Sequence, residues 1–365
     1  MDERILKHAE ILSKYSLDIK KGERLLIWGD IVTFPLIKEI YCQTLKLGAF
    51  PQLNITSDEI REISLKHGAN DQLKYVPESM LKMVDEIDAG LVIQGASNTR
   101  ILSQIDAEKI KIEAQGNSVL AEKIFEKYGK GKLKWCETVF PNQAAAQEAD
   151  MSLVDYENFF YRSLLIDYED PVKKWKEIDV DQERICSLLD KKKNLKITSK
   201  GTELSMAIEG RKWVNCAGKL NLPDGEIFTA PIEDSVEGTI RFSFPGIIDG
   251  REIEDIQLTF KKGKVIEAKA KKGSDLLHQL LDTDEGAKYV GEIAVGTNFQ
   301  IKKFTRNMMF DEKLGGTIHL ALGRSIPGSR GQNKSAIHWD LICDMEDSGE
   351  IYADGELIYR QSKFI

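Results

Sequence analysis

The stretch "ERLLIWGDIVTFPLIKEIYCQTLKLGAFPQLNI", residues 23–55, decides the fold of the first half of the chain. Residues 23–30 form a short apolar run typical of a buried strand, and residues 36–47 carry apolar side chains near helical spacing. Gly48 is placed to end that helix, and residues 50–55 have the pattern of a second strand. Because strand–helix–strand units build parallel sheets, the sequence predicts an α/β domain at the N-terminus.

The same pattern continues further along the chain. Residues 89–97 and 132–141 resemble additional strands, with a helical pattern over residues 110–128 between them. A helical, acidic segment follows, and the charged run "DKKKN" ends it. We therefore predict an α/β domain with a parallel sheet over residues 1–190.

The second half has a different texture. The segments "NLKITSKGTELSMAI", "GTIRFSF" and "EDIQLTFKKGKVIEAKA" are strand-like, and "KKGK", residues 261–264, marks a hairpin turn. One helical pattern, from residue 274 to about residue 290, interrupts the strands. We predict that residues 191–365 form a mainly β (α+β) domain.

The composition limits the possible partners. A chain of 365 residues is longer than one core usually holds, which agrees with two domains. The formal net charge of −8, with both signs mixed along the chain, argues against nucleic acid as a partner. No apolar stretch approaches the roughly 18 residues that span a membrane, and no signal-peptide pattern opens the sequence. No glycine-rich nucleotide motif follows the first strand. The five cysteines are scattered and form no C-x-x-C pair, so we expect a cytoplasmic protein.

Potential metal ligands occur on strands near the C-terminus. In "SAIHWDLICD", residues 335–344, alternation places His338 and Asp340 on one face of an otherwise apolar strand. In "GTIHLALG" His319 lies opposite an apolar face. A symmetric hairpin centred near residues 328–329 would place His319 directly across from His338, with Cβ atoms about 4.5–5.5 Å apart.

Two glutamates further upstream could complete the site. Glu226 begins the strand "EIFTAP" after a turn, and Glu292 follows the helical segment. Two of the candidates also have a plain structural explanation: His319 could be a hydrogen-bonded core residue, and Glu226 could be a solvated residue after a turn. Two imidazoles and three carboxylates together would suit Zn, Mn, Co or Mg, and could hold two ions.

Four longer motifs resemble those of a known family. "NLPDGEIFTAP", "DEGAKYVGEIAVGTN", "FDEKLGGTIHLALG" and "NKSAIHWDLI" occur in the order found in the aminopeptidase T / aminopeptidase S (thermophilic aminopeptidase) metallopeptidases. The resemblance implies a metal-dependent aminopeptidase that removes the N-terminal residue of short peptides with two divalent ions. It also implies a homodimer. Carried over motif by motif, the metal ligands are the five residues that the strands indicated: Glu226, Glu292, His319, His338 and Asp340.

Some roles stay open. The general base is expected to be a glutamate, Glu292 or Glu285. Family members commonly have a tyrosine seven residues after the histidine of the "HLALG" motif, where this chain has Ile326. Another donor could polarise the scissile carbonyl in its place, and the candidates are Arg324, Arg330 and Lys334.

Two other functions remain possible from the sequence. His319, His338 and Asp340 form a 2-His-1-carboxylate set of the kind that binds a single Fe(II), and ring-cleaving dioxygenases resemble the same family. The missing tyrosine would also suit a catalytically weak metal-binding protein. Glu226 and Glu292 favour two metals, because a single iron would not need them.

Overall fold

The computed structural model describes residues 2–248 and 250–365. The chain forms two compact units: unit 1 contains Met1–Trp175 and Gly218–Pro223, and unit 2 contains Lys176–Ala217 and Asp224–Ile365. The division into domains 1–190 and 191–365 stays a prediction.

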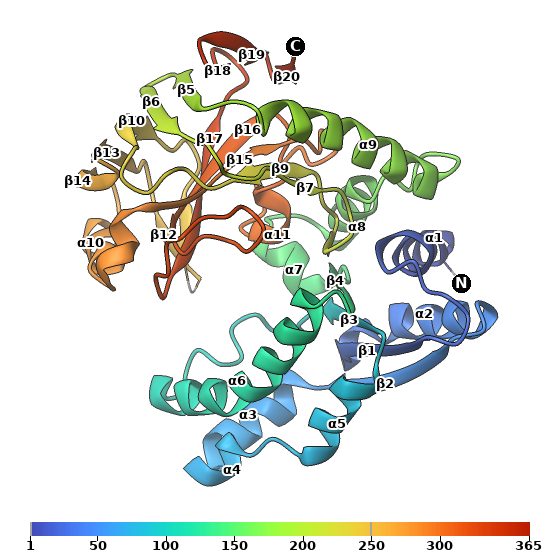
Figure 1. Ribbon diagram of the computed structural model, residues 1–365. Coiled ribbons are helices and arrows are strands. Elements are labelled where there is room, and N and C mark those ends of the chain that lie inside the picture. The colour runs from blue at the N-terminus through green and yellow to red at the C-terminus, as the bar shows by residue number, and fades with distance from the viewer. Residues whose placement is uncertain (1, 249) are drawn as a thin grey trace. The chain divides into compact units, whose positions relative to one another are not determined.

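Unit 1 confirms the predicted parallel α/β architecture. The strand–helix–strand unit at its start consists of β1 (Arg24–Asp30), α2 (Phe34–Lys46) and β2 (Phe50–Thr56), and the two strands pair in parallel. Gly48 has a φ of +76°, as expected for the residue that ends a helix. The sheet order is β2-β1-β3-β4-β8, and Figure 1 labels the first four of these strands. The remaining strands are β3 (Ala89–Gln94), β4 (Lys134–Val139) and β8 (Asn221–Leu222).

Helices make up most of the rest of unit 1. The longest described helix that lies wholly within it is α6, which covers the helical pattern predicted over residues 110–128. None of the helices among the described residues is long and apolar enough to cross a membrane. The helices are α1 (Glu3–Ile11), α3 (Asp58–His67), α4 (Asn70–Lys74), α5 (Glu78–Glu86), α6 (Ala107–Gly129), α7 (Gln143–Glu148) and α8 (Leu153–Ser163), while α9 (Pro171–Leu189) leads on into unit 2.

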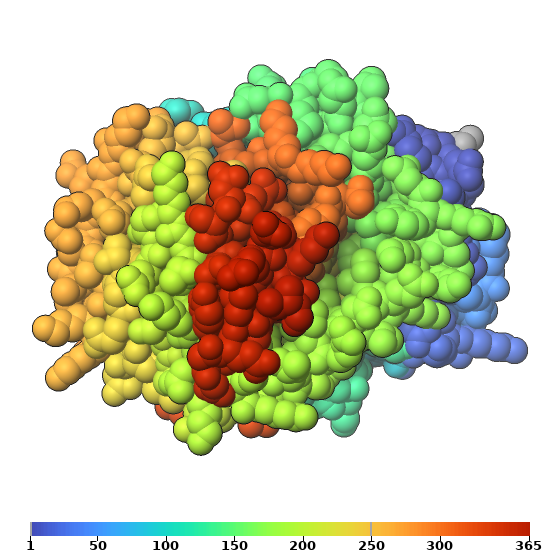
Figure 2. Space-filling model, turned by 90° about the horizontal axis from the view of Figure 1, so that it is seen from above, coloured from blue at the N-terminus to red at the C-terminus, as the bar shows by residue number. Residues whose placement is uncertain are grey.

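Unit 2 is mainly β, as predicted. Its largest sheet has eight strands in the order β14-β13-β10-β6-β5-β18-β19-β20, and the colours of Figure 2 follow this order from orange through yellow and green to red. The predicted hairpin turn is present, with positive φ at Lys262 and Gly263, as a two-residue type I′ turn requires. The strands are β5 (Asn194–Ser199), β6 (Thr202–Ala207), β10 (Glu237–Arg241), β13 (Gln257–Lys261), β14 (Lys264–Lys269), β18 (Glu350–Ala353), β19 (Glu356–Arg360) and β20 (Lys363–Phe364).

A second sheet of five strands carries the predicted ligands. Its order is β17-β16-β15-β9-β7, and all its pairs are antiparallel. One face of this sheet is apolar and shares a single buried core with the eight-stranded sheet, as two stacked sheets do. The strands are β7 (Val214–Cys216), β9 (Glu226–Thr229), β15 (Val290–Gly296), β16 (Thr317–Gly323) and β17 (His338–Asp344); the smaller elements of unit 2 are β11 (Gly246–Ile248), β12 (Arg251–Ile253), α10 (Ser274–Leu281) and α11 (Met308–Asp311).

The predicted register of the β16–β17 hairpin is wrong. The strands do pair antiparallel, but His319 lies opposite Ile342, and His338 lies opposite Gly323. The loop between the strands is too long to fix a register by turn geometry. Because side chains alternate with a period of two, this even offset still leaves His319 on the same face as His338 and Asp340.

Candidate metal centre

The strand pairing brings all five predicted ligands to one face of the five-stranded sheet. Residues directly opposite each other in neighbouring strands share a face. Between β9 and β15, Glu226 lies opposite Gly296. Between β15 and β16, Glu292 lies opposite Ala321 and Ala294 lies opposite His319. Between β16 and β17, Ala321 lies opposite Asp340 and Gly323 lies opposite His338. The residues of β15 and β16 that are paired with ligands are alanine or glycine, which leaves room above the sheet for the longer polar side chains.

Glu292 lies between the two histidines. The Nε2 atom of His319 is 3.3 Å from Glu292 Oε1 and 3.2 Å from Glu226 Oε2. The Nε2 atom of His338 is 3.5 Å from Asp340 Oδ2 and 4.0 Å from Glu292 Oε2. Two groups of potential ligands result, and within each the ligand atoms lie within 4.8 Å of one another: Glu226, Glu292 and His319 form one group, and Glu292, His338 and Asp340 form the other. Glu292 belongs to both.

The three carboxylates are buried, and their surroundings shift their pKa values in different directions. Burial raises the pKa of Glu226, but the Lys313 ammonium and the His319 imidazole outweigh it and lower the pKa to about 2. Burial also raises the pKa of Glu292, and there it prevails. At Asp340 the effect of burial is outweighed by the hydrogen bond from His338, so the pKa is lowered.

Both imidazoles are held beside negative charge. Burial lowers the pKa of His338, but Asp340 and Glu292 raise it to about 9. Burial opposes charge at His319 as well, and Glu226 and Glu292 still raise its pKa well above the usual value. The two imidazoles therefore take up protons easily when no other cation is near these carboxylates.

The donor atoms fit a divalent cation. Glu292 Oε2 and Asp340 Oδ1 are buried, and neither has a hydrogen-bond partner among the described residues. Buried carboxylate oxygens without partners are costly unless a proton or a cation compensates them. His338 Nδ1 lies 2.6 Å from the carbonyl oxygen of Arg324, so Nδ1–H donates to that oxygen and Nε2 is left to bind a cation.

Two charged residues of the site were missed in the sequence. Glu312 and Lys313 lie in the "FDEKLGG" segment just before β16, where no strand alternation could point to them. A carboxylate oxygen of Glu312 lies within 4.8 Å of ligand atoms of His319 and Asp340, and burial raises the pKa of Glu312 to about 8. Lys313 is fully buried, with Nζ 3.0 Å from Glu226 Oε1. The only sequence signal for them was the "FDEKLGG" motif itself.

The structure places the other predicted residues differently. Glu285 is exposed at the start of the short 3₁₀ turn Glu285–Lys288, and none of the described contacts joins it to the five ligands. Arg324, Arg330 and Lys334 are exposed in the loop between β16 and β17. Arg324 Nε donates to the carbonyl oxygen of Ser335 over 3.0 Å.

A buried cluster of imidazoles and carboxylates on one face of an antiparallel sheet is typical of a metal-dependent protein. The family comparison agrees with this class: the chain belongs to the thermophilic metalloprotease (M29) family, whose model matches residues 1–364. It is thus a metal-dependent enzyme that hydrolyses peptide bonds.

Curated relatives and one solved structure are similar over nearly the whole chain. Aminopeptidase 2 of Geobacillus stearothermophilus is 27% identical, over 93% of this chain and 92% of the relative. Aminopeptidase T of Thermus thermophilus is 26% identical, over 96% of this chain and 95% of the relative. The solved structure "Wild-type AmpT from Thermus thermophilus" has a TM-score of 0.86 at 23% identity and covers 100% of this chain and 99% of that one. This likeness confirms the predicted fold class.

Proposed function

We propose that the protein is an aminopeptidase that binds two divalent ions through Glu226, Glu292, His319, His338 and Asp340. The family supplies metal-dependent peptidase activity, and the curated relatives are named aminopeptidases. The single observation that carries the proposal of two ions is the position of Glu292. Its two carboxylate oxygens face different imidazoles, at 3.3 Å and 4.0 Å, as a carboxylate shared between two cations would.

The charge of the site supports two ions rather than one. Five carboxylates cluster here, those of Asp224, Glu226, Glu292, Glu312 and Asp340, and Lys313 is the cation among them. Neutral imidazoles would leave four uncompensated negative charges, which two divalent ions balance and one does not. Without ions, protons must supply part of the compensation, in agreement with the raised pKa values of Glu292 and Glu312.

Bound divalent ions would lower the pKa of a water molecule and polarise the scissile carbonyl group. The residues of the chain supply the proton transfer. We propose Glu312 as the group that accepts the proton of the attacking water and passes it to the leaving amine. Its carboxylate lies within 4.8 Å of ligand atoms of His319 and Asp340, and its side chain is 18% exposed, so substrate could reach it. Glu292 as the base stays a prediction, and so does the exposed Glu285.

The carboxylate cluster also suits the substrate class. A peptide with a free N-terminus carries an α-ammonium group, which the negative site attracts, whereas a blocked N-terminus does not. We propose short peptides as substrates, Zn, Co, Mn or Mg as the ions, and a homodimer in the cytoplasm. The cytoplasmic location agrees with the five cysteines, which are all free.

The test is hydrolysis of aminoacyl arylamides by the metal-loaded protein, with the variants Glu292→Gln and Glu312→Gln. We expect kcat to fall at least about 100-fold in each, because one loses a shared ligand and the other the proton acceptor. Glu203→Gln changes an exposed glutamate of β6 and should leave kcat unchanged. Unchanged turnover in Glu292→Gln would refute the assignment.

The single-iron alternative makes a different prediction. A ring-cleaving oxygenase would bind one oxygen-sensitive iron per chain through His319, His338 and Asp340 and would leave arylamides intact. The position of Glu292 favours the aminopeptidase, because its two oxygens face different imidazoles.

A further inference from the structure

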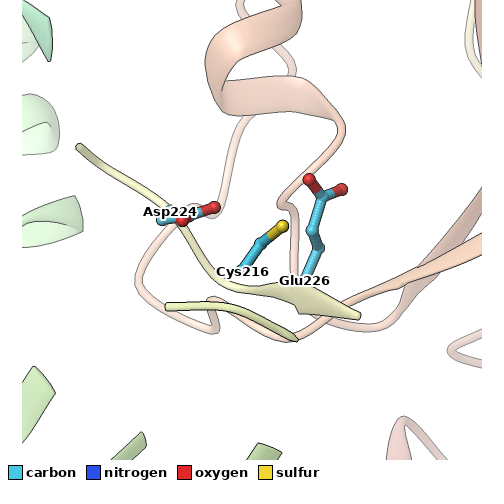
Figure 3. A group of neighbouring side chains, drawn as sticks. All are labelled: Cys216, Asp224 and Glu226. Atoms are coloured by element: carbon cyan, nitrogen blue, oxygen red, sulfur yellow. The ribbon is translucent and has the colours of Figure 1, made fainter. Parts of the chain in front are cut away.

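A further group of potential ligands, separate from the two that share Glu292, lies beside the proposed metal centre. Ligand atoms of Cys216, Asp224 and Glu226 lie within 4.8 Å of one another. Figure 3 shows that Cys216 and Glu226 extend to the same side of the neighbouring strands β7 and β9, with Asp224 in the segment just before β9. A thiol and two carboxylates at this spacing form a position in which a cation would be stabilised.

A cation of the chain itself is already close to this position. The Nζ atom of Lys313 is 3.0 Å from Glu226 Oε1 and 3.7 Å from Asp224 Oδ1, and it also pairs with Glu312. The Lys313 side chain has no exposed surface, so water does not screen these ion pairs. Its charge therefore acts strongly on Asp224 and Glu226.

The two oxygens of Glu226 serve different partners. Oε1 accepts a hydrogen bond from Lys313, while Oε2 lies 3.2 Å from His319 Nε2. With one oxygen held by the ammonium, only the other remains for the metal centre.

We propose that Lys313 is a built-in counter-ion that fills the cation position between Cys216, Asp224 and Glu226. It keeps metal out of that position and holds Glu226 with one oxygen toward the metal centre. Lys313 is thus a positioning residue. The inference rests on the proposed function in one respect, that Glu226 is a metal ligand.

The backbone around this position is held without Lys313. Gln182 Nε2 donates to the carbonyl oxygens of Cys216 and Glu226 over 3.0 Å and 2.9 Å. Asn298 Nδ2 donates to the carbonyl oxygen of Asp224 over 2.8 Å. Replacing Lys313 should therefore leave the three ligands in place and remove one positive charge from beside the buried carboxylates, and a divalent ion would replace that charge.

The experiment is a Cd²⁺ titration of the full chain, which counts bound ions and records the ultraviolet charge-transfer band of a thiolate–cadmium bond. It uses a Cys42→Ser background, because Cys42 is an exposed thiol. We expect the parent protein to bind two ions without a thiolate band. Lys313→Met should gain a third ion together with the band, and adding Cys216→Ser should remove both. Lys313→Arg keeps the charge and should behave as the parent.

Several results would overturn the inference. A thiolate band that Cys216→Ser removes from the parent protein would show that metal enters beside Lys313, and this result needs no lysine variant. If Lys313→Met binds two ions and shows no thiolate band, then removing the lysine opens no cation position. Lys313→Gln takes its place in this test if the methionine variant does not fold. Failure of the proposed function looks different, since the parent would then bind fewer than two ions or leave arylamides intact.

Discussion

His338 shows how a single candidate ligand depends on its immediate surroundings. Its Nδ1–H is committed to the carbonyl oxygen of Arg324, so the atom that faces Asp340 and Glu292 is Nε2. Strand alternation predicted that His338 and Asp340 share a face. The backbone partner of Nδ1 could not be predicted, because it belongs to the loop that leaves β16.

Metal binding should become tighter as the pH rises. The pKa of His338 is about 9, since Asp340 and Glu292 outweigh the effect of burial, and a metal requires the neutral imidazole. Below that pKa a proton must leave, so affinity for Zn²⁺ should increase by about tenfold per pH unit for each proton released. Competition with a chelator at several pH values between about pH 6 and pH 8 measures this. The exposed His278 provides the control, because His278→Gln should leave the slope unchanged. A flat profile would contradict the expectation.

The roles of Glu312 and Lys313 in the site could not be predicted from strand alternation. The five predicted ligands lie on strands or at their starts, where alternation assigns a face. Glu312 and Lys313 precede β16 in a segment without strand periodicity, so only the folded chain brings them to Glu226 and Asp340.

At the scale of elements, the β16–β17 hairpin positions both histidines. The shared face of His319, His338 and Asp340 was predicted correctly, because it depends only on the alternation of side chains along each strand. The register was not, because it depends on how closely the two backbones approach each other. Gly323 lies directly opposite His338 and has a φ of +97°. A Cβ atom there would lie 2.2 Å from the carbonyl oxygen of Ile337, so only glycine permits this pairing.

Gly323→Ala should therefore weaken both stability and metal binding. We expect the free energy of unfolding to fall by about 1–3 kcal/mol, from backbone strain and the clash together. Gly355→Ala is the matched control, because Gly355 also has a positive φ but a Cβ atom there meets nothing within 4 Å. It should lose only the strain energy, about 1 kcal/mol, and keep its metal affinity. Urea unfolding and Zn²⁺ titration of both variants measure these effects. Equal losses of metal affinity would contradict the role of the close approach.

Helix α1 carries a buried histidine that should make unit 1 sensitive to acid. His8 Nε2–H donates to Thr138 Oγ1 over 2.9 Å, because Thr138 itself donates to the carbonyl oxygen of Leu222. Burial lowers the pKa of His8 from 6.5 to about 3. The unfolded chain therefore binds a proton that the folded chain does not, so stability is full above about pH 6.5 and falls as the pH drops toward 3.

His8→Gln should flatten this dependence, since the amide can still donate to Thr138 but does not titrate. The difference between the two proteins should be on the order of a few kcal/mol between about pH 7 and pH 4. Denaturant unfolding at these pH values measures it. The exposed His67 gives the comparison, and His67→Gln should leave the pH dependence as it is. The same loss of stability in His8→Gln on acidification would disprove the role of His8.

At the scale of the whole molecule, the sequence predicted the class of each half. The helical spacing of residues 36–47 predicted a parallel sheet, and the strand-like segments after residue 190 predicted a mainly β second half, whose large sheets are antiparallel. The sequence pattern did not predict that Asn221–Leu222 would pair with β4 as a strand of the first sheet. So short a strand has no periodicity to recognise, and its pairing partner is distant in the sequence.

The whole protein should be less stable without metal. Lys313 and protons then compensate part of the charge of the carboxylate cluster, whereas bound ions stabilise the folded state alone. At metal concentrations about 1,000 times Kd, one site contributes about 4 kcal/mol. Thermal unfolding before and after treatment with a chelator should show a lower Tm that added Zn²⁺ or Mn²⁺ restores. An unchanged Tm would contradict a buried metal centre.

The central claim is that one face of the five-stranded sheet holds two cations that share Glu292. The most direct measurement is anomalous scattering from crystals grown with Zn²⁺ or Mn²⁺. We predict two ions per chain, one beside Glu226 and His319 and one beside His338 and Asp340, with an oxygen of Glu292 on each. A single ion bound by His319, His338 and Asp340 alone, or ions bound elsewhere, would contradict the account.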